Sequence, residues 1–348
     1  MLCDLHNHIG KNMSIDELKN YFLSLKEKNG VDRNCIMSIP CSPTSAYYHT
    51  QNLLALQLKD MVSPYSSAFM GLVHGEGAED YLTQLKKGLE MGFEGLKILE
   101  CHPSLELELD FRMNDMRFDA MFQYAEENEI PVLMHVADPE ESWDINTVNE
   151  YALTHGRFYG AQGRRPKEEY YKEVEDILER HPKLKVIFAH FYFLSADIDR
   201  ATALFEKYPN IAFDLTPGKE MYENFGKNLE KTKAFFERFA DRLYYGTDVN
   251  DTSAITYHSS LYTLVSTALE SNEPFQWGKY NCAGLGLSEE AQEKIKSKNF
   301  IKLLGKTPKP LNYEAIRKEI ARLEAQVDIM NDNDIQNLKS IKEYFENK

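Results

Sequence analysis

The sequence of 348 residues predicts a (β/α)8 barrel, a closed ring of eight parallel strands with helices outside it, followed by a C-terminal helical extension. Three observations favour this fold class. Eight short apolar runs alternate with amphipathic stretches along most of the chain. Several runs, such as LKVIFAH and PVLMHV, are apolar almost throughout, as strands buried on both faces are. The hydrophobic fraction of 43% allows a large core and excludes global disorder.

The eight apolar runs give the order of the expected strands. They are Leu2–His8, Asn34–Ile39, Ala68–His74, Phe93–Leu99, Pro131–Val136, Leu184–His190, Asn210–Leu215 and Arg242–Asp248. The interval between the fifth and sixth strands is the longest. Its excess, about residues 137–166, is expected to be an inserted loop over the C-terminal face of the barrel.

The expected helices are marked by their ends. Ser14 and Glu17 have the spacing of a capping box, and Gly30 ends the helix that they begin. The other expected helices are Asp80–Met91, Phe118–Asn128, Glu168–Arg180, Ser195–Lys207, Lys227–Phe239 and Ser288–Leu304. Each of them ends at or shortly before a glycine, a proline or the next apolar run.

Pro308 and Pro310 mark a boundary after the last of these helices. The sequence therefore predicts a barrel domain over residues 1–305 and a tail over residues 306–348, in which we expect one or two peripheral helices. The alternative fold is an open doubly wound sheet, which usually binds its ligand through a glycine-rich first turn. The first turn here, HNHIGKN, lacks the GxGxxG pattern.

The composition excludes several classes of partner. Lys and Arg number 40 and Asp and Glu 55, so the net charge is −15, whereas nucleic acids and anionic membranes require a basic face. Five scattered cysteines without a CxxC pair argue against a disulfide framework and favour a cytoplasmic location. Neither a signal peptide nor a membrane span is expected. The expected partner is a small-molecule substrate, and assembly into a homo-oligomer is left open.

Residues suited to metal binding lie at the ends of the expected strands. They are His6, His8, Lys97, His135, His190 and Asp248. Carboxyl ends of barrel strands meet at one mouth, so these side chains are expected to converge. His6 and His8 are two residues apart on a strand and therefore share a face. Two imidazoles with a carboxylate are good ligands for a divalent ion such as Zn²⁺.

This pattern resembles the amidohydrolase superfamily, and within it the amidohydrolase-related branch that includes the aminocarboxymuconate-semialdehyde decarboxylase type. The resemblance covers roughly residues 1–305 and is carried by DLHNH, GFEGLKIL, PVLMHV, HPKLKVIFAH, YPNIAFDL, RLYYGTD and LSEEAQEKIKSKNFIKLLG. HxH together with GTD is its most specific part. Phe300 departs from the branch, which often has a small residue at that place.

The resemblance implies roles for the strand-end residues. His6, His8 and His135 correspond to metal ligands, and Asp248 to an acid that binds the metal, accepts a proton from activated water, or does both. His190 corresponds to an acid/base or orienting group beside one ion, or to a ligand of a second ion. Lys97 is either a carbamylated bridge between two ions or an unmodified amine. One Zn²⁺ is favoured, because the branch is mostly mononuclear.

A basic loop after the fifth strand suggests an anionic substrate. The segment HGRFYGAQGRR contains Arg157, Arg164 and Arg165, and arginine binds carboxylates through a bidentate fork. A solvated loop is the alternative interpretation. Tyr192, close behind His190, is a further candidate for the pocket wall. We also expect His74 and His102 to form loop hydrogen bonds or to reach the mouth, and Glu100 to be solvated, to pair with a base or to act in the site.

Three functions remain open from the sequence. The first is a metal-dependent hydrolase that acts on a small, anionic amide, ester or lactone, in which Asp248 relays the proton of metal-activated water. The second is a metal-dependent non-oxidative decarboxylase on the same scaffold, in which His190 or Asp248 protonates the carbon. The third is a barrel that binds a ligand without catalysis, but none of the expected ligand residues is missing.

Overall fold

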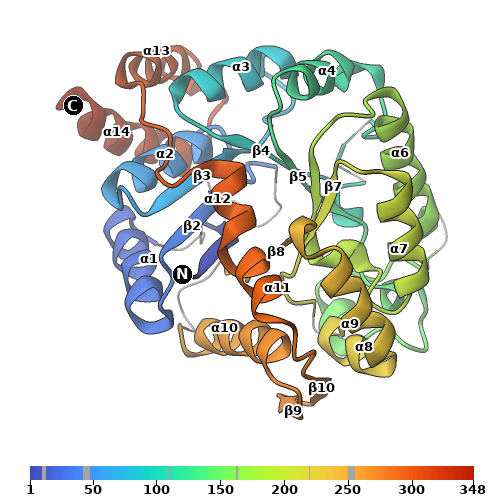
Figure 1. The fold of residues 1–348 in the computed structure, drawn as a ribbon. Helices are drawn as coiled ribbons and strands as arrows, with labels where there is room; N and C mark the ends of the chain where they lie inside the picture. The colour runs from blue at the N-terminus through green and yellow to red at the C-terminus, as the bar shows by residue number, and fades with distance from the viewer. Residues whose placement is uncertain are drawn as a thin grey trace.

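The computed structural model describes residues 1–9, 13–41, 48–106, 108–109, 111–161, 164–218, 220–249 and 255–348 (Figure 1). Its eight parallel strands follow one another around a barrel in chain order, which confirms the predicted fold class. The strands are β1 (Cys3–His8), β2 (Arg33–Met37), β3 (Ser66–Met70), β4 (Gly95–Cys101), β5 (Val132–Val136), β6 (Val186–Phe188), β7 (Ile211–Asp214) and β8 (Leu243–Tyr244).

The barrel closes where the chain leaving β8 meets β1. Asn7 and Val249 form a parallel bridge, and the N–H of His8 donates to the carbonyl of Val249 at 2.7 Å. The N–H of Asp248 donates to the carbonyl of His6 at 2.8 Å. The contacts that close the barrel therefore join the two segments that carry candidate ligands, β1 and the residues after β8.

Helices surround the barrel and connect its strands (Figure 1). They are α1 (Ile15–Asn29), α2 (Gln51–Met61), α3 (Tyr81–Met91), α4 (Asp119–Glu127), α5 (Glu150–Thr154), α6 (Lys167–Arg180), α7 (Ile198–Lys207), α8 (Met221–Lys227), α9 (Leu229–Arg238), α10 (Ile255–Glu270), α11 (Glu289–Glu293), α12 (Asn299–Leu304), α13 (Tyr313–Glu324) and α14 (Asp332–Glu346). A short antiparallel pair, β9 (Pro274–Trp277) and β10 (Tyr280–Ala283), follows α10. Among the described residues, no helix has the length and hydropathy needed to span a membrane.

The predicted capping of α1 is confirmed in full. The hydroxyl of Ser14 accepts the N–H of Glu17, and the carboxylate of Glu17 accepts the N–H of Ser14. Gly30 follows the helix with φ of 66°, a conformation that glycine adopts without a Cβ clash. The apolar positions Leu18 and Phe22 are buried against the barrel, so this helix begins, ends and packs as its sequence predicts.

Several strands end earlier than expected, and at β6 the cause is a left-handed backbone. β6 stops at Phe188, and residues 190–193 then take φ values of 50–56°. β8 stops at Tyr244, and Asp248 beyond it has φ of 57°. A strand cannot continue through four such residues, so His190 lies just outside the ladder, whereas Asp248 takes part in the contacts that close the barrel. β3 likewise ends at Met70, which leaves His74 in the following loop.

The interior of the barrel is filled from one end by α12. Its side chains Phe300 and Leu304 are buried in one cluster with the inward residues of the strands. The strand members of this cluster are Cys3, Leu5, Cys35, Met37, Phe69, Leu133, Ile187, Ala212 and Tyr244, and Ala189 just after β6 joins them. In the family branch that the sequence resembles, a small residue often stands at the position of Phe300. Here its ring, together with Leu304, fills one end of the barrel, and we call α12 the plug. Figure 1 shows α12 crossing the barrel in front of β2 and β8.

A π-helical turn attaches this plug to the sheet. The helix from α11 to α12 contains a π segment over residues 294–298. This segment presents the carbonyl of Ile295 to the N–H of Tyr245 at 3.1 Å. The amide of Asn299 donates to the carbonyls of Ala240 and Leu243, both at 2.7 Å. The plug is thus fixed to β8 by polar contacts as well as by packing.

The expected C-terminal helices are present and pack beside α2 and α3, at the upper left of Figure 1. The buried carboxylate of Asp334 accepts the N–H groups of His49 and Thr50 at 3.1 and 3.0 Å, just ahead of α2. The carboxylate of Asp60 accepts the hydroxyls of Tyr313 and Tyr344. A domain boundary at residue 305 stays a prediction.

Replacing Phe300 by alanine should destabilise the protein by about 3–5 kcal/mol, because it removes a fully buried ring and leaves a cavity in the barrel. Urea unfolding followed by circular dichroism measures this loss. Leu303→Ala, at a partly buried position of the same helix, serves as the control and should cost less. An unfolding midpoint for Phe300→Ala equal to that of the wild type would contradict the role of the plug.

Candidate active site

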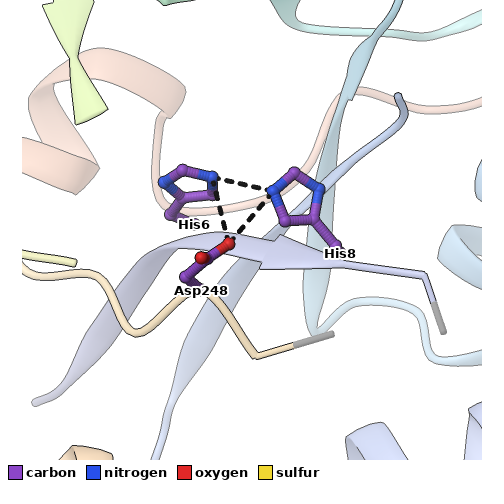
Figure 2. Close-up of side chains that lie close together, drawn as sticks. All are labelled: His6, His8 and Asp248. Atoms are coloured by element: carbon purple, nitrogen blue, oxygen red, sulfur yellow. Dashed lines mark hydrogen bonds and ion pairs between the residues drawn. The ribbon is translucent and has the colours of Figure 1, made fainter. Parts of the chain in front are cut away.

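His6, His8 and Asp248 meet at the point where the barrel closes (Figure 2). The Nε2 atoms of the two histidines lie 2.9 Å apart, and Oδ1 of Asp248 lies 3.2 Å from His8 and 3.7 Å from His6. The two histidines come from alternate positions of β1, as the sequence predicts. Their rings are buried, whereas the side chain of Asp248 is 32% exposed and gives the group its access to solvent. We call these three residues the triad.

Contacts on the far side of each ring fix which nitrogen carries the proton. Nδ1 of His6 lies 2.7 Å from the carboxylate of Asp214, and Nδ1 of His8 lies 3.1 Å from the carbonyl of Met37. Both oxygens can only accept, so each imidazole donates from Nδ1 and keeps a bare lone pair on Nε2. Two such lone pairs and a carboxylate oxygen converge, and this donor set fits a divalent cation.

The electrostatics around His6 favour its neutral, metal-binding form. Burial and the nearby Lys97 lower the pKa of His6 to about 3, despite the contact with Asp214. Burial alone would raise the pKa of Asp214, but its contact with His6 outweighs this effect and lowers the pKa to about 2. Asp214 is therefore a carboxylate that orients His6. Burial would likewise raise the pKa of Asp248, yet hydrogen bonding to His8 holds that pKa well below the usual range.

Lys97 reaches the triad from β4. Its Nζ lies 3.0 Å from Nε2 of His6, and the side chain is only 1% exposed. Burial lowers the pKa of this amine to about 8, although Asp248 and Asp214 act in the opposite direction. The structure thus brings Lys97 together with three of the predicted ligands.

A row of imidazole rings continues from the triad across the barrel mouth. Ring centroids lie 4.8 Å apart for His8 and His6, 5.9 Å for His6 and His190, 4.8 Å for His190 and His135, and 4.6 Å for His135 and His102. His190 is the middle member and lies between the triad and the remaining rings. We call these five rings the histidine row.

The far end of the histidine row is a second buried carboxylate. Oδ2 of Asp138 lies 3.5 Å from Nε2 of His102 and accepts the hydroxyl of Tyr159 at 2.7 Å. Nε2 of His135 lies 3.0 Å from the carbonyl of Ala137 and 3.9 Å from Asp138. The predicted fifth-strand ligand is therefore grouped with His102 and Asp138, whereas the triad consists of the other three. Its assignment as a ligand stays a prediction.

The structure does not bring Arg164, Arg165 or Tyr192 to the triad. Arg165 pairs with Glu106 at 2.8 Å and also with Glu173, and Arg164 lies 3.7 Å from Glu106. The ring of Tyr192 is stacked in the packed layer outside β6, where it is 3% exposed. Arg157 differs from the other two arginines, because its charge acts on His102 and on Asp138 at the mouth.

Sequence reasoning missed two acids of the site. Asp214 is the last residue of β7, so the same strand-end argument that selects Asp248 also applies to it. Asp138 follows His135 by three residues in HVAD. Only the folded chain reveals its contacts with His102, from an earlier segment, and with Tyr159, from a later one.

The sequence matches the family model Amidohydro_2, described as amidohydrolase, over residues 47–306. β1 with His6 and His8 lies ahead of the matched range. No curated protein sequence matches the chain.

Solved structures share the fold at low identity. An uncharacterised TIM-barrel protein from Bordetella bronchiseptica is 13% identical, with a TM-score of 0.55 over 87% of this chain and 98% of the other. 4-Oxalomesaconate hydratase from Rhodopseudomonas palustris is 14% identical, with a TM-score of 0.54 over 94% and 98%. 2,6-Dihydroxybenzoate decarboxylase from Rhizobium is 13% identical, with a TM-score of 0.53 over 87% and 98%.

Replacing Asp214 by asparagine should weaken divalent-metal binding by roughly 10–100-fold, because His6 loses the carboxylate that fixes its Nδ1 proton. Competition with a chromogenic chelator measures the affinity. Asp199→Asn, at an exposed position, is the matched control and should bind as the wild type does. Equal affinities of the two variants would contradict the orienting role of Asp214.

Proposed function

The chain belongs to the amidohydrolase family, and on this basis we propose that it is a metal-dependent lyase that decarboxylates a small carboxylate substrate without an oxidant. One observation carries the proposal: a donor set that fits a divalent ion lies at one end of a row of imidazoles. Decarboxylation needs an electrophile beside the substrate, which the bound ion would supply. It also needs an acid that replaces the departing carboxylate by a proton, which an imidazole of the row would supply. The names of two similar structures, a hydratase and a decarboxylase, support the same reaction class.

The ion would be held by His6, His8 and Asp248. When bound, a divalent ion supplies Lewis-acid polarisation of a substrate oxygen. Zn²⁺ suits two imidazoles and one carboxylate. We favour a single ion, because His6, His8 and Asp248 already converge on one point, whereas a two-ion site would also require His190 as a ligand and Lys97 as a carbamate.

In this proposal His190 handles the proton. Its backbone N–H donates to Asp214 at 2.8 Å, and its Nδ1 lies 3.3 Å from the carbonyl of Thr216. Because Nδ1 donates to that carbonyl, Nε2 is the atom that gains and loses a proton. Phe193 stacks on the ring with centroids 5.2 Å apart and limits the access of water.

The bond changes are balanced without a further reactant. The bond between the substrate carbon and its carboxylate breaks, and the electron pair stays on the carbon as CO₂ leaves. His190 then delivers a proton to that carbon and regains one from solvent. Substrate charge would be matched by Lys97 at the triad and by Arg157, whose charge acts on His102 and Asp138 at the mouth.

A hydrolase of a small amide, ester or lactone is the second candidate. The observation that favours it is the partial exposure of Asp248, the member of the triad through which water reaches the site. There Asp248 would accept the proton of the attacking water and pass it to the leaving group. The first candidate does not require this transfer.

Isotope labelling separates the two candidates. The Zn²⁺-loaded protein is incubated in D₂O with hydroxybenzoates and oxo-dicarboxylates, and in H₂¹⁸O with esters, amides and lactones. We expect CO₂ release and one deuterium on the carbon that carried the carboxylate. ¹⁸O in a product carboxylate without CO₂ release would overturn the proposal in favour of the hydrolase.

Replacing His190 by glutamine should lower kcat by roughly 10²–10⁴-fold, because the proton donor is lost, while metal content is unchanged. Asp248→Asn should instead lower both metal content and turnover. Metal analysis and steady-state kinetics on both variants, with circular dichroism to establish folding, distinguish these outcomes. Full activity of His190→Gln would remove His190 from the mechanism.

A further inference from the structure

A second cluster of metal-ligating side chains lies at the ends of β2, β3 and β4. Cys41 follows β2, His74 follows β3, and Glu100 belongs to β4. Their donor atoms all lie within 4.8 Å of one another, and all three residues are buried. Oε1 of Glu100 accepts the thiol of Cys41 at 3.5 Å and lies 2.8 Å from Nε2 of His74. The cluster shares no residue with the triad, which is built on β1 and the chain after β8.

Neighbouring groups hold the histidine of the cluster in place. Nδ1 of His74 lies 2.9 Å from the hydroxyl of Tyr81, which orients the ring and leaves Nε2 toward Glu100. The hydroxyl of Tyr48 accepts the backbone N–H of His74 at 2.8 Å and donates to its carbonyl at 2.7 Å. A ring held by a partner at its other nitrogen is typical of histidine metal ligands.

The carboxylate is held in the same way. Oε2 of Glu100 accepts the N–H of Leu99 at 2.8 Å, so Oε1 is the oxygen left for the cluster. Each of these two side chains is thus fixed through one atom and offers another to the same point. The thiol of Cys41 supplies the third donor.

Nucleophilic catalysis explains the arrangement less well than metal binding does. An activated thiol needs its base as the direct hydrogen-bond partner. Here thiol and imidazole both contact one carboxylate oxygen, and no hydrogen bond joins them to each other among the described residues.

We propose that Cys41, His74 and Glu100 form a second divalent-metal site, distinct from the triad. Sulfur, imidazole nitrogen and carboxylate oxygen together suit Zn²⁺, and three protein ligands leave one position for water. Binding converts the thiol to a thiolate and releases one proton to solvent. The ion would tie together the ends of three neighbouring strands.

Cobalt(II) is the probe, because a bound thiolate gives it a near-ultraviolet charge-transfer band that imidazole and carboxylate ligands do not. Chelator-treated full-length protein is titrated with Co²⁺, and absorbance and bound metal are recorded together. We expect two ions per chain and the thiolate band. Cys41→Ser should lose the band and one ion, while Cys282→Ser, at another buried cysteine, should keep both.

Further variants make the result independent of the proposed function. Asp248→Ala should lose one ion and keep the band, and His74→Asn should lose the band, with circular dichroism establishing that each variant folds. No band in the wild type, or a band that survives in Cys41→Ser, would overturn the second site. One bound ion with the thiolate band would support the Cys41 site and contradict metal binding by the triad. One bound ion without the band would support the triad and overturn the Cys41 site.

Discussion

The hydrogen bond from the N–H of Asp248 to the carbonyl of His6 joins the end of the barrel to its beginning. The same contact sets the carboxylate of Asp248 against the imidazoles of His6 and His8, so closing the barrel and assembling the triad are one event. An ion that binds the closed barrel and not the open chain stabilises the fold by mass action. The arrangement also explains why the ligands can lie so far apart in sequence. They come together because closing the barrel brings β1 and the residues after β8 side by side.

Much of the fold and part of the site could be predicted from the sequence, because they depend on local pattern. Apolar runs gave the strand order, and the HxH spacing placed two imidazoles on one face of β1. The hairpin of β9 and β10 was missed, since all of its residues except Cys282 are exposed or half-buried and its apolar pattern is weak. The exact end of β6 depends on a left-handed backbone that begins at His190, which the apolar pattern of the sequence does not indicate.

Charge is distributed differently from what the sequence suggests. The basic loop after β5 stands out in a chain with a net charge of −15. In the structure, however, Arg164 and Arg165 both form ion pairs with Glu106, and Arg165 also pairs with Glu173. Positive charge at the mouth comes from Lys97 in the barrel interior and from Arg157 of the loop. Arg164 and Arg165 were expected to bind substrate because they follow the fifth strand in sequence. In the folded protein their guanidinium groups pair with nearby carboxylates instead.

The left-handed turn over residues 190–193 has a consequence for how this protein can change. Four successive non-glycine residues in that conformation cost about 4–8 kcal/mol in total, at 1–2 kcal/mol each. Glycine would relieve the strain but would release the backbone that aims His190 and would remove the ring of Phe193 that covers it. Stability and precision therefore pull in opposite directions at this turn. Selection for thermal stability alone would favour the replacement of these residues, and engineering for stability should leave them unchanged.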